Sequence, residues 1–403
     1  MNKLITFLSL LVLLASCTNN KTESKATGDS TLVMLASPVT DSSAEPYLFT
    51  NNKGLVYLSW VQKKGKESSL QFSTLANDQW SQPIVISSGN NWFVNWADYP
   101  VITSDSNGNM LAHFLEKSDT AKFTYDIKLM ASADAGKTWS SSKILHDDGK
   151  KAEHGFVSIT PYNDQFFVAW LDGRKTAMKD DAGHHEGHHG EMTLRGALLN
   201  KTGNKTKEWE LDPRICDCCQ TSIAITANGP VVVYRDRSAE EIRDMSIVRF
   251  INGEWTEPKT IFPDQWKIAG CPVNGPRSDA IGNNLAIAWF SMAENKAQVK
   301  VVFSEDGGAT FKEPFQIDEG KPIGRVDIVM LNEKSAMISW MEGSTIKAIK
   351  INADGTKGKP IIIAESSDSR ASGFPQMTKT GNKLIFAWSD NKEKTIKLAS
   401  INL

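Results

Sequence analysis

The chain has 403 residues, and its 45 Lys and Arg residues nearly balance 47 Asp and Glu residues to give a net charge of -2. This balance excludes the strongly basic surface on which nucleic-acid binding usually depends, so we expect no nucleic-acid partner. Hydrophobic residues make up 40% of the chain, enough for a globular core, and many of the 12 Trp residues recur at similar places in a repeat.

The first 30 residues have the pattern of an export signal followed by a tether. Lys3 precedes an apolar run over residues 4–14, which is too short to span a bilayer and is typical of a signal segment. The run ends in Leu-Ala-Ser-Cys17, which resembles a bacterial lipobox; the alternative is a secretory signal with an incidental Cys. The resemblance predicts a lipoprotein signal peptide over 1–16 and a lipid on Cys17. We expect a flexible tether over 17–30 and a membrane-anchored protein of the bacterial cell envelope, on its periplasmic or cell-surface side.

A short apolar run that ends near an aromatic residue occurs seven times between residues 31 and 403. Such runs are too short for helices and rich in β-branched and aromatic residues, so they predict strands. One strand before each run and two after it make units of four antiparallel strands, each about fifty residues long, which is typical of a β-propeller. The aromatic residues are Trp60, Phe114, Trp170, Tyr234, Trp289, Trp340 and Trp388.

Two of the predicted turns between the third and fourth strands match the Asp-box pattern S-x-D-x-G-x-T-W, with Phe in place of Trp in the second copy. The Asp carboxylate can accept backbone N–H groups of the turn, the Gly can take a positive φ, and the aromatic side chain can anchor the turn in the core. We therefore expect these residues to be structural and not catalytic. They are Asp134, Gly136 and Trp139 in the first copy and Asp306, Gly308 and Phe311 in the second.

The repeat predicts an all-β fold with one propeller over residues 31–403. Seven blades are favoured, and six are the alternative if one copy is misassigned. The last copy has only three strands, and the segment Thr31–Ala36 is a spare strand that we expect to complete the last blade and close the ring. We expect a monomer.

In a propeller, the first strands of the blades begin on one face, where the loops between second and third strands also lie, and the Asp boxes lie on the opposite face. All four cysteines after Cys17 fall in the segments that open two neighbouring blades: Cys216, Cys218, Cys219 and Cys271. Two loops are predicted to overhang them. One runs from Asp172 and contains the His-rich stretch at residues 184–192, and the other runs from Arg235 to Asp244.

The cysteines allow two principal interpretations. Disulfides are usual in an oxidising compartment. The alternative is a thiolate site for Cu(I) or Zn(II), assisted by His154 or by the His-rich stretch, although C-x-C-C lacks the paired spacing of zinc modules. A catalytic cysteine is a third reading, but it has no identified base.

Arginine residues form another candidate site. Arg277, Arg325 and Arg370 open three consecutive blades, and several guanidinium groups around a channel can clamp a carboxylate. The alternative is that they form ion pairs with Asp98, Asp327 or other carboxylates. The candidate ligand-binding residues beside them are Arg235, Asp236, Arg237 and Asn274.

The Asp boxes and the blade repeat resemble the sialidase/BNR-repeat superfamily, in which six blades are common. The resemblance implies an arginine triad for a sugar carboxylate, a Tyr nucleophile paired with a Glu, and an Asp acid/base. It maps loosely onto Arg277, Arg325 and Arg370 for the triad and onto Asp98 for the acid, with Tyr99 among the few Tyr residues near the predicted channel. The Arg-Ile-Pro motif of the superfamily is absent from the first blade. The C-x-C-C segment also resembles a bacterial subgroup described as sialidase-like.

Three functions are therefore open. The first is binding or hydrolysis of acidic, sialic-acid-type glycans at the channel face. The second is binding of Cu or Zn by the cysteines. The third is a non-catalytic scaffold for another envelope protein.

Overall fold

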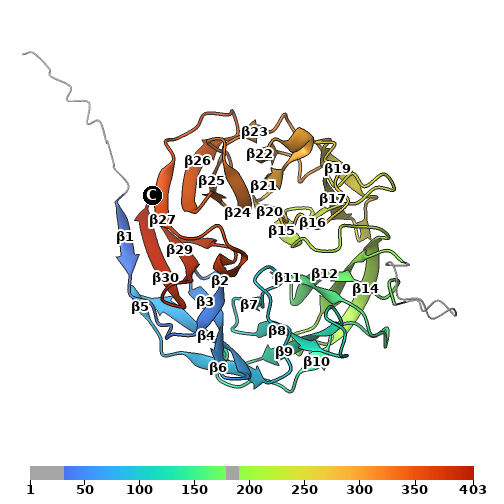
Figure 1. The fold of residues 1–403 in the computed structure, drawn as a ribbon, viewed down its shortest axis with the longest axis vertical. Helices are drawn as coiled ribbons and strands as arrows, with labels where there is room; N and C mark the ends of the chain where they lie inside the picture. The colour runs from blue at the N-terminus through green and yellow to red at the C-terminus, as the bar shows by residue number, and fades with distance from the viewer. Residues whose placement is uncertain (1–30, 178–189) are drawn as a thin grey trace, which may run out of the picture.

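The structure is a computed structural model and describes residues 31–177 and 190–403 (Figure 1). The predicted signal peptide, the lipid on Cys17, the tether and the His-rich residues 184–189 lie outside the described residues. Across the described part of the chain, no helix is long and apolar enough to cross a membrane.

Seven antiparallel sheets surround a central axis (Figure 1). The first contains β2 (Ser43–Thr50), β3 (Val56–Lys64), β4 (Glu67–Ala76) and β5 (Gln79–Trp80), with β6 (Ile84–Gly89) also paired to β4. The second contains β7 (Ile102–Ser104), β8 (Met110–Lys117), β9 (Tyr125–Ser132) and β10 (Lys143–Ile144). The third contains β11 (His154–Tyr162), β12 (Gln165–Asp172), β13 (Thr193–Leu199) and β14 (Lys205–Asp212).

The fourth sheet contains β15 (Ser222–Thr226), β16 (Gly229–Arg235), β17 (Met245–Ile251) and β18 (Glu254–Trp255), with β19 (Lys259–Phe262) paired to β17. The fifth contains β20 (Arg277–Ile281), β21 (Asn284–Ser291), β22 (Gln298–Ser304) and β23 (Phe315–Gln316). The sixth contains β24 (Pro322–Asn332), β25 (Ser335–Glu342), β26 (Thr345–Asn352) and β27 (Ile361–Glu365). Two short 3-10 turns, η1 (Ala293–Asn295) and η2 (Arg370–Ser372), lie in loops.

The seventh sheet joins the two ends of the propeller. Its order is β1-β30-β29-β28, where β28 is Gln376–Thr380, β29 is Lys383–Asp390, β30 is Thr395–Asn402 and β1 is Leu32–Leu35. Leu32 pairs with Ile401 and Leu35 with Leu398. The predictions of seven blades and of a ring closed by the N-terminal strand are therefore confirmed, and the six-blade alternative is wrong.

The second strands carry the core, because neighbouring blades cover both of their faces. Trp60, Trp170, Trp289 and Trp340 are at most 1% exposed, and each such burial contributes on the order of 2–3 kcal/mol. A buried indole N–H needs an acceptor. Three of these indoles donate to a carboxylate at 2.7–2.8 Å: Trp170 to Asp172, Trp289 to Asp264 and Trp340 to Glu342.

Both Asp-box turns have the same internal hydrogen bonds. In the first, Asp134 Oδ1 accepts the Thr138 N–H at 2.9 Å, and Ser132 Oγ accepts the Gly136 N–H at 2.9 Å. Gly136 has φ +82°, and the Trp139 ring packs edge-on against Phe72. The second turn repeats these bonds through Asp306, Thr310, Ser304 and Gly308, with Gly308 at φ +83° and Phe311 packed against the core.

Candidate functional site

The antiparallel order places the starts of the first strands, and the loops between second and third strands, on the face opposite the Asp boxes. Two cavities open there. The channel cavity, of about 140 Å³, lies on the axis and includes Tyr47, Asp98, Tyr99, Arg277 and Asp327 in its lining. The rim pocket, of about 240 Å³, lies beside it and is lined by Phe93, Asn95, Trp96, Ala97, Phe123, Tyr125, Glu153, Phe156, Asp217, Cys218, Cys271, Val273 and Arg370.

Two carboxyl groups share one tyrosine hydroxyl between these cavities. The hydroxyl of Tyr125 lies 2.8 Å from Glu153 Oε1 and 3.2 Å from Asp98 Oδ2. Asp98 Oδ1 also accepts the Phe156 N–H at 2.7 Å. A phenol has one proton and can donate to only one carboxylate at a time. This arrangement therefore favours a second proton on one of the carboxyl groups.

The pKa values of Asp98 and Glu153 also indicate that one of the two carboxyl groups holds a proton near neutral pH. Burial raises the pKa of Asp98 to about 7, against the hydrogen bonds from Phe156 and Tyr125. Burial also raises the pKa of Glu153 to about 8, opposed by the Tyr125 hydrogen bond and reinforced by Asp98. Carboxyl groups that hold a proton near neutral pH can act as general acids.

Arg277 and Tyr99 lie together on the channel wall. Arg277 donates a hydrogen bond to the Tyr99 hydroxyl, and its guanidinium lies over the Tyr99 ring at 5.8 Å. Asp327 Oδ1 is 3.9 Å from Arg277 Nε. Burial raises the pKa of Asp327 to about 6, although Arg277 opposes this rise. Of the three arginines expected around the channel, Arg277 alone is in the lining of the channel cavity.

Arg325 does not join Arg277 in the channel. Its guanidinium donates to Ser372 Oγ and to the backbone carbonyls of Gly373, Asp368 and Ser369, at distances of 2.6–3.2 Å. It is 5% exposed, and burial lowers its pKa to about 10. Arg370 lines the rim pocket, and its guanidinium is 6.0 Å from the centre of the Trp96 ring. The structure therefore does not assemble the expected arginine triad.

The residues proposed as ligand-binding have local partners instead. Arg235 is 2% exposed and donates to the backbone carbonyls of Asn274, Arg243 and Phe290. Asn274 in turn accepts the Arg325 N–H at 2.8 Å. Arg237 binds Glu241, and Asp236 accepts the Ser246 hydroxyl at 3.1 Å. These bonds show how the loops are held, and they leave Arg235 no free donor face for a ligand.

Three of the cysteines lie together. Cys216 Sγ is 3.9 Å from Cys218 Sγ and 3.8 Å from Cys219 Sγ, and all three sulfur atoms lie within 4.8 Å of one another. All four described cysteines are free thiols. Cys218 and Cys271 both line the rim pocket, so the two neighbouring segments meet as predicted from their positions in the repeat.

His154 belongs to a different cluster. Its Nε2 atom hydrogen-bonds Asp148 at 2.9 Å, and its ring stacks on His146 with centroids 3.6 Å apart. Asp172 Oδ1 lies 3.8 Å from the same nitrogen. The expectation that His154 assists the cysteines is corrected by these contacts, because its imidazole interacts with the carboxylates of Asp148 and Asp172.

Sequence reasoning missed three residues of this face. Tyr125, Glu153 and Trp96 were not among the candidates. Trp96 stacks on Phe374 with centroids 5.6 Å apart and lies under both Arg325 and Arg370. A signal for Tyr125 was available, since it begins the third strand β9 and so lies at the same face as the first-strand segments.

A larger groove adjoins the rim pocket. It encloses about 820 Å³ between the first and seventh blades, and its lining includes Glu45, Lys63, Trp96, Arg370 and Lys394. Trp96 and Arg370 line both cavities. Burial raises the pKa of Glu45 to about 7, which reduces its negative charge near neutral pH. Asp390 also lines the groove, so three basic side chains stand against two acidic ones and the lining has an excess of positive charge.

This fold and these cavities define a sialidase-like β-propeller. Residues 63–386 match the BNR repeat-like domain family, and the chain belongs to that family. A search of curated proteins finds no match to the sequence.

Solved structures show the same architecture at low identity. The polysaccharide lyase Uly1 has a TM-score of 0.55 and 10% identity, over 89% of this chain and 90% of the lyase. The α-L-arabinanase of Penicillium chrysogenum has a TM-score of 0.51 and 11% identity, over 92% of this chain and 98% of the arabinanase. The Hadza microbial sialidase Hz136 has a TM-score of 0.44 and 13% identity, over 74% of this chain and 63% of that sialidase. Likeness at this level shows the fold alone.

Proposed function

We propose that this propeller binds acidic glycans where the rim pocket meets the groove, with Trp96 and Arg370 at the centre of the site. The observation that carries the proposal is that these two side chains line both cavities. An aromatic side chain adds apolar contact area for sugar C–H groups, and a guanidinium offers a two-pronged donor to a sugar carboxylate.

Arg370 is suited to this role because its charge is uncommitted. Among residues 31–177 and 190–403, no ion pair of 4.0 Å or less involves it, whereas Arg174, Arg195, Arg214 and Arg237 each have a carboxylate partner. Lys63 and Lys394, also in the groove lining, add positive charge for a second acidic unit.

Binding assays with Arg370→Gln test the proposal. Acidic oligosaccharides that contain sialic acid or a uronic acid would be titrated calorimetrically against the full chain, with neutral oligosaccharides for comparison. A charged hydrogen bond contributes about 1.5–3 kcal/mol, so we expect Arg370→Gln to weaken acidic ligands at least about tenfold. Lys312→Gln, on an Asp-box turn, is the control. Equal affinity of wild type and Arg370→Gln for acidic glycans would refute the site.

The hydrolytic form of the proposal assigns the general acid to Glu153. Its carboxyl group is in the rim-pocket lining and retains a proton near neutral pH. Fluorogenic sialosides and uronides would report turnover. We expect Glu153→Gln to abolish turnover while acidic glycans still bind. If wild type hydrolyses no acidic glycoside, the hydrolytic proposal is refuted. The binding proposal does not depend on this result and is tested by the calorimetric titrations.

The location of the protein is also a proposal. We propose a lipid anchor on Cys17 that holds the propeller in the bacterial cell envelope. Metabolic labelling with a fatty acid tests it: label should enter the wild-type chain and not Cys17→Ala.

A further inference from the structure

The spacing of the three buried sulfur atoms is that of ligands around one metal ion. Two thiolates bound at about 2.3 Å with a tetrahedral angle between them have sulfur atoms about 3.8 Å apart. Cys216 Sγ lies 3.8 Å from Cys219 Sγ and 3.9 Å from Cys218 Sγ. A disulfide would join only two of the three at about 2.05 Å, whereas Cys216 is almost equally distant from both partners.

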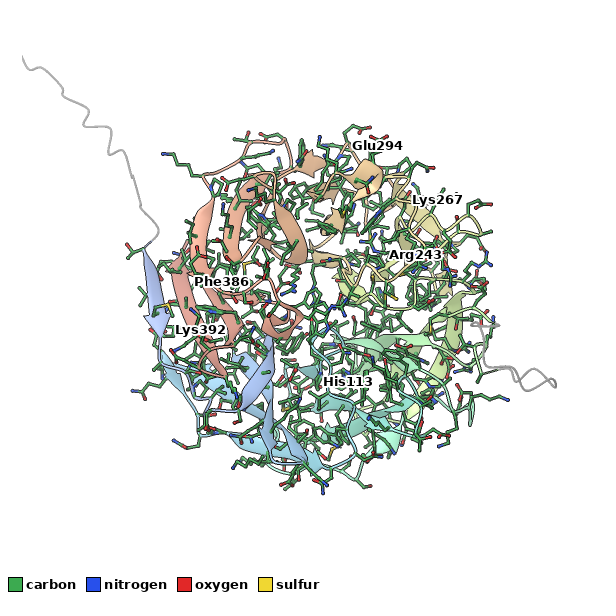
Figure 2. All side chains as sticks on the ribbon, in the orientation of Figure 1. His113, Arg243, Lys267, Glu294, Phe386 and Lys392 are labelled. Atoms are coloured by element: carbon green, nitrogen blue, oxygen red, sulfur yellow. The ribbon has the colours of Figure 1, made fainter. Side chains whose placement is uncertain are left out.

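Several thiolates close together repel one another, and a positively charged side chain beside the three cysteines reduces this repulsion. Arg243, labelled within the fourth blade in Figure 2, donates through Nη1 to Cys216 Sγ at 3.2 Å. Glu241 fixes the same guanidinium by accepting from Nη2 at 2.8 Å. Donors aimed at ligand sulfur atoms are typical of the surroundings of thiolate metal sites.

The loop that holds the sulfur atoms is fixed from several sides. The Cys216 N–H donates to the Arg235 carbonyl at 3.1 Å. The Gln220 side chain donates to the Ala97 carbonyl at 2.7 Å and accepts the Gly275 N–H at 2.9 Å, so it joins the cysteine loop to the second blade and to the Cys271 loop. A Cβ at Gly275 would lie 2.2 Å from the Gln220 carbonyl, which explains the glycine. Such support keeps ligand atoms in place before the ion arrives.

A fourth thiol gives the site an entrance. Cys271 is exposed, and its thiol interacts with that of Cys218 at the wall of the rim pocket. The other two sulfur atoms are buried. The cluster therefore has a closed inner side and one side that opens on the pocket.

We propose that Cys216, Cys218 and Cys219 bind one thiophilic metal ion, Cu(I) or Zn(II), that enters and leaves through the rim pocket past Cys271. Both ions favour thiolate sulfur. The metal site shares the rim pocket with Arg370. Metal binding is measured without any glycan, so this proposal and the glycan proposal can fail independently.

Metal titration of the reduced full chain without an affinity tag tests the proposal. Zn(II) and Cu(I) would be titrated anaerobically against competing chelators, and Co(II) would report thiolate ligation through its charge-transfer absorption. We expect one equivalent per chain and a thiolate–Co(II) band. Loss of a residue that supports a metal ligand weakens metal binding by roughly 10–100-fold, and we expect a loss of this size for Arg243→Gln. Cys219→Ser removes a ligand and should weaken metal binding by more than this. Dissociation constants measured at equal chelator competition give the affinity of the site for each ion.

Two controls keep the test decisive. Replacing His184, His185, His188 and His189 with Ala removes the His-rich stretch and should leave the tight equivalent unchanged. Circular dichroism and thermal melting of each Cys variant show that the propeller is folded. The proposal is overturned if the folded, reduced wild type binds neither ion stoichiometrically, or if the tight equivalent persists without the three cysteines. It is also overturned if native protein holds a Cys216–Cys219 or Cys218–Cys219 disulfide that thiol reductants do not open.

Discussion

The two faces of the propeller use the same residue types in opposite ways. On the Asp-box face, Asp134 is exposed, and hydrogen bonds from the Thr138 N–H, the Thr138 hydroxyl and the Ser132 hydroxyl lower its pKa to about 2. On the opposite face, Asp98 is 2% exposed and burial raises its pKa to about 7. Exposed carboxylates that bind their own turn stabilise it, whereas buried carboxyl groups hold protons that chemistry can use. The first face shows what kind of fold this is, and the second is where ligands should be sought.

The Asp-box turns should be sensitive to added volume. At Gly136, a Cβ would lie 2.4 Å from Phe72 Cζ, and φ is +82°. Strain at positive φ and overpacking together predict that Gly136→Ala lowers the free energy of unfolding by about 3 kcal/mol. Urea denaturation measures the loss, and metal and glycan affinities should not change.

Gly65→Ala is the matched control for that substitution. Gly65 has φ +63°, but a Cβ added there would meet no other atom within 4 Å. Only the backbone cost of about 1 kcal/mol should remain. Equal losses at the two glycines would show that packing around the Asp box is not the cause.

On the opposite face, Gln220→Ala should reduce both stability and metal affinity. It leaves the Ala97 carbonyl and the Gly275 N–H without their side-chain partner, at a cost of about 2 kcal/mol. Because Gln220 positions the cysteine loop, Co(II) affinity should fall too, while the absorption of the Co(II) complex stays that of thiolate ligation. Lost stability with unchanged Co(II) affinity would contradict a positioning role.

Glu153→Gln should change the pH dependence of stability. Glu153 titrates near 4.5 in the unfolded chain and near 8 in the folded protein. Between these values the folded state keeps a proton that the unfolded chain has lost, so wild-type stability falls as pH rises through this range. Gln cannot ionise, so the melting temperature of the variant should rise relative to wild type from pH 4.5 to pH 8. A difference that does not vary with pH would exclude a raised pKa; Glu305→Gln on the Asp-box face is the control.

The smallest effect should come from an exposed ion pair on the Asp-box face. Lys312 Nζ lies 2.9 Å from Glu305 Oε1, and both side chains are more than 60% exposed. Exposed pairs contribute about 0–1 kcal/mol, so Lys312→Ala should scarcely change the urea midpoint. A loss as large as that of Gly136→Ala would mean that turn charges, and not turn geometry, stabilise this face.

The parts of the fold that could be predicted depend on contacts close in sequence. The buried second-strand aromatics and both Asp boxes are local patterns, and the spare segment Thr31–Ala36 followed from the count of strands. Blade number and ring closure follow from them without knowledge of any side-chain position.

Side-chain direction could not be predicted in the same way. The sequence placed Arg235 and Arg325 near the channel face, but both guanidinium groups donate hydrogen bonds to backbone carbonyls of other loops. The imidazole of His154 forms a hydrogen bond with Asp148. Tyr125 was missed because its partners, Asp98 and Glu153, come from segments on either side of it along the chain. Each of these outcomes depends on an acceptor outside the local repeat pattern, which periodicity does not reveal.

Closure of the ring by β1 and β30 also sets an order of events as the chain is made. Leu32 finds its partner Ile401 only after almost the whole propeller has been synthesised. Until β30 has been made, β1 has no strand to pair with, because β30 is its neighbour in the sheet. Unpaired edges recruit other strands, so β1 is exposed to mispairing until β30 has been made. The first strand to emerge is the last to be placed.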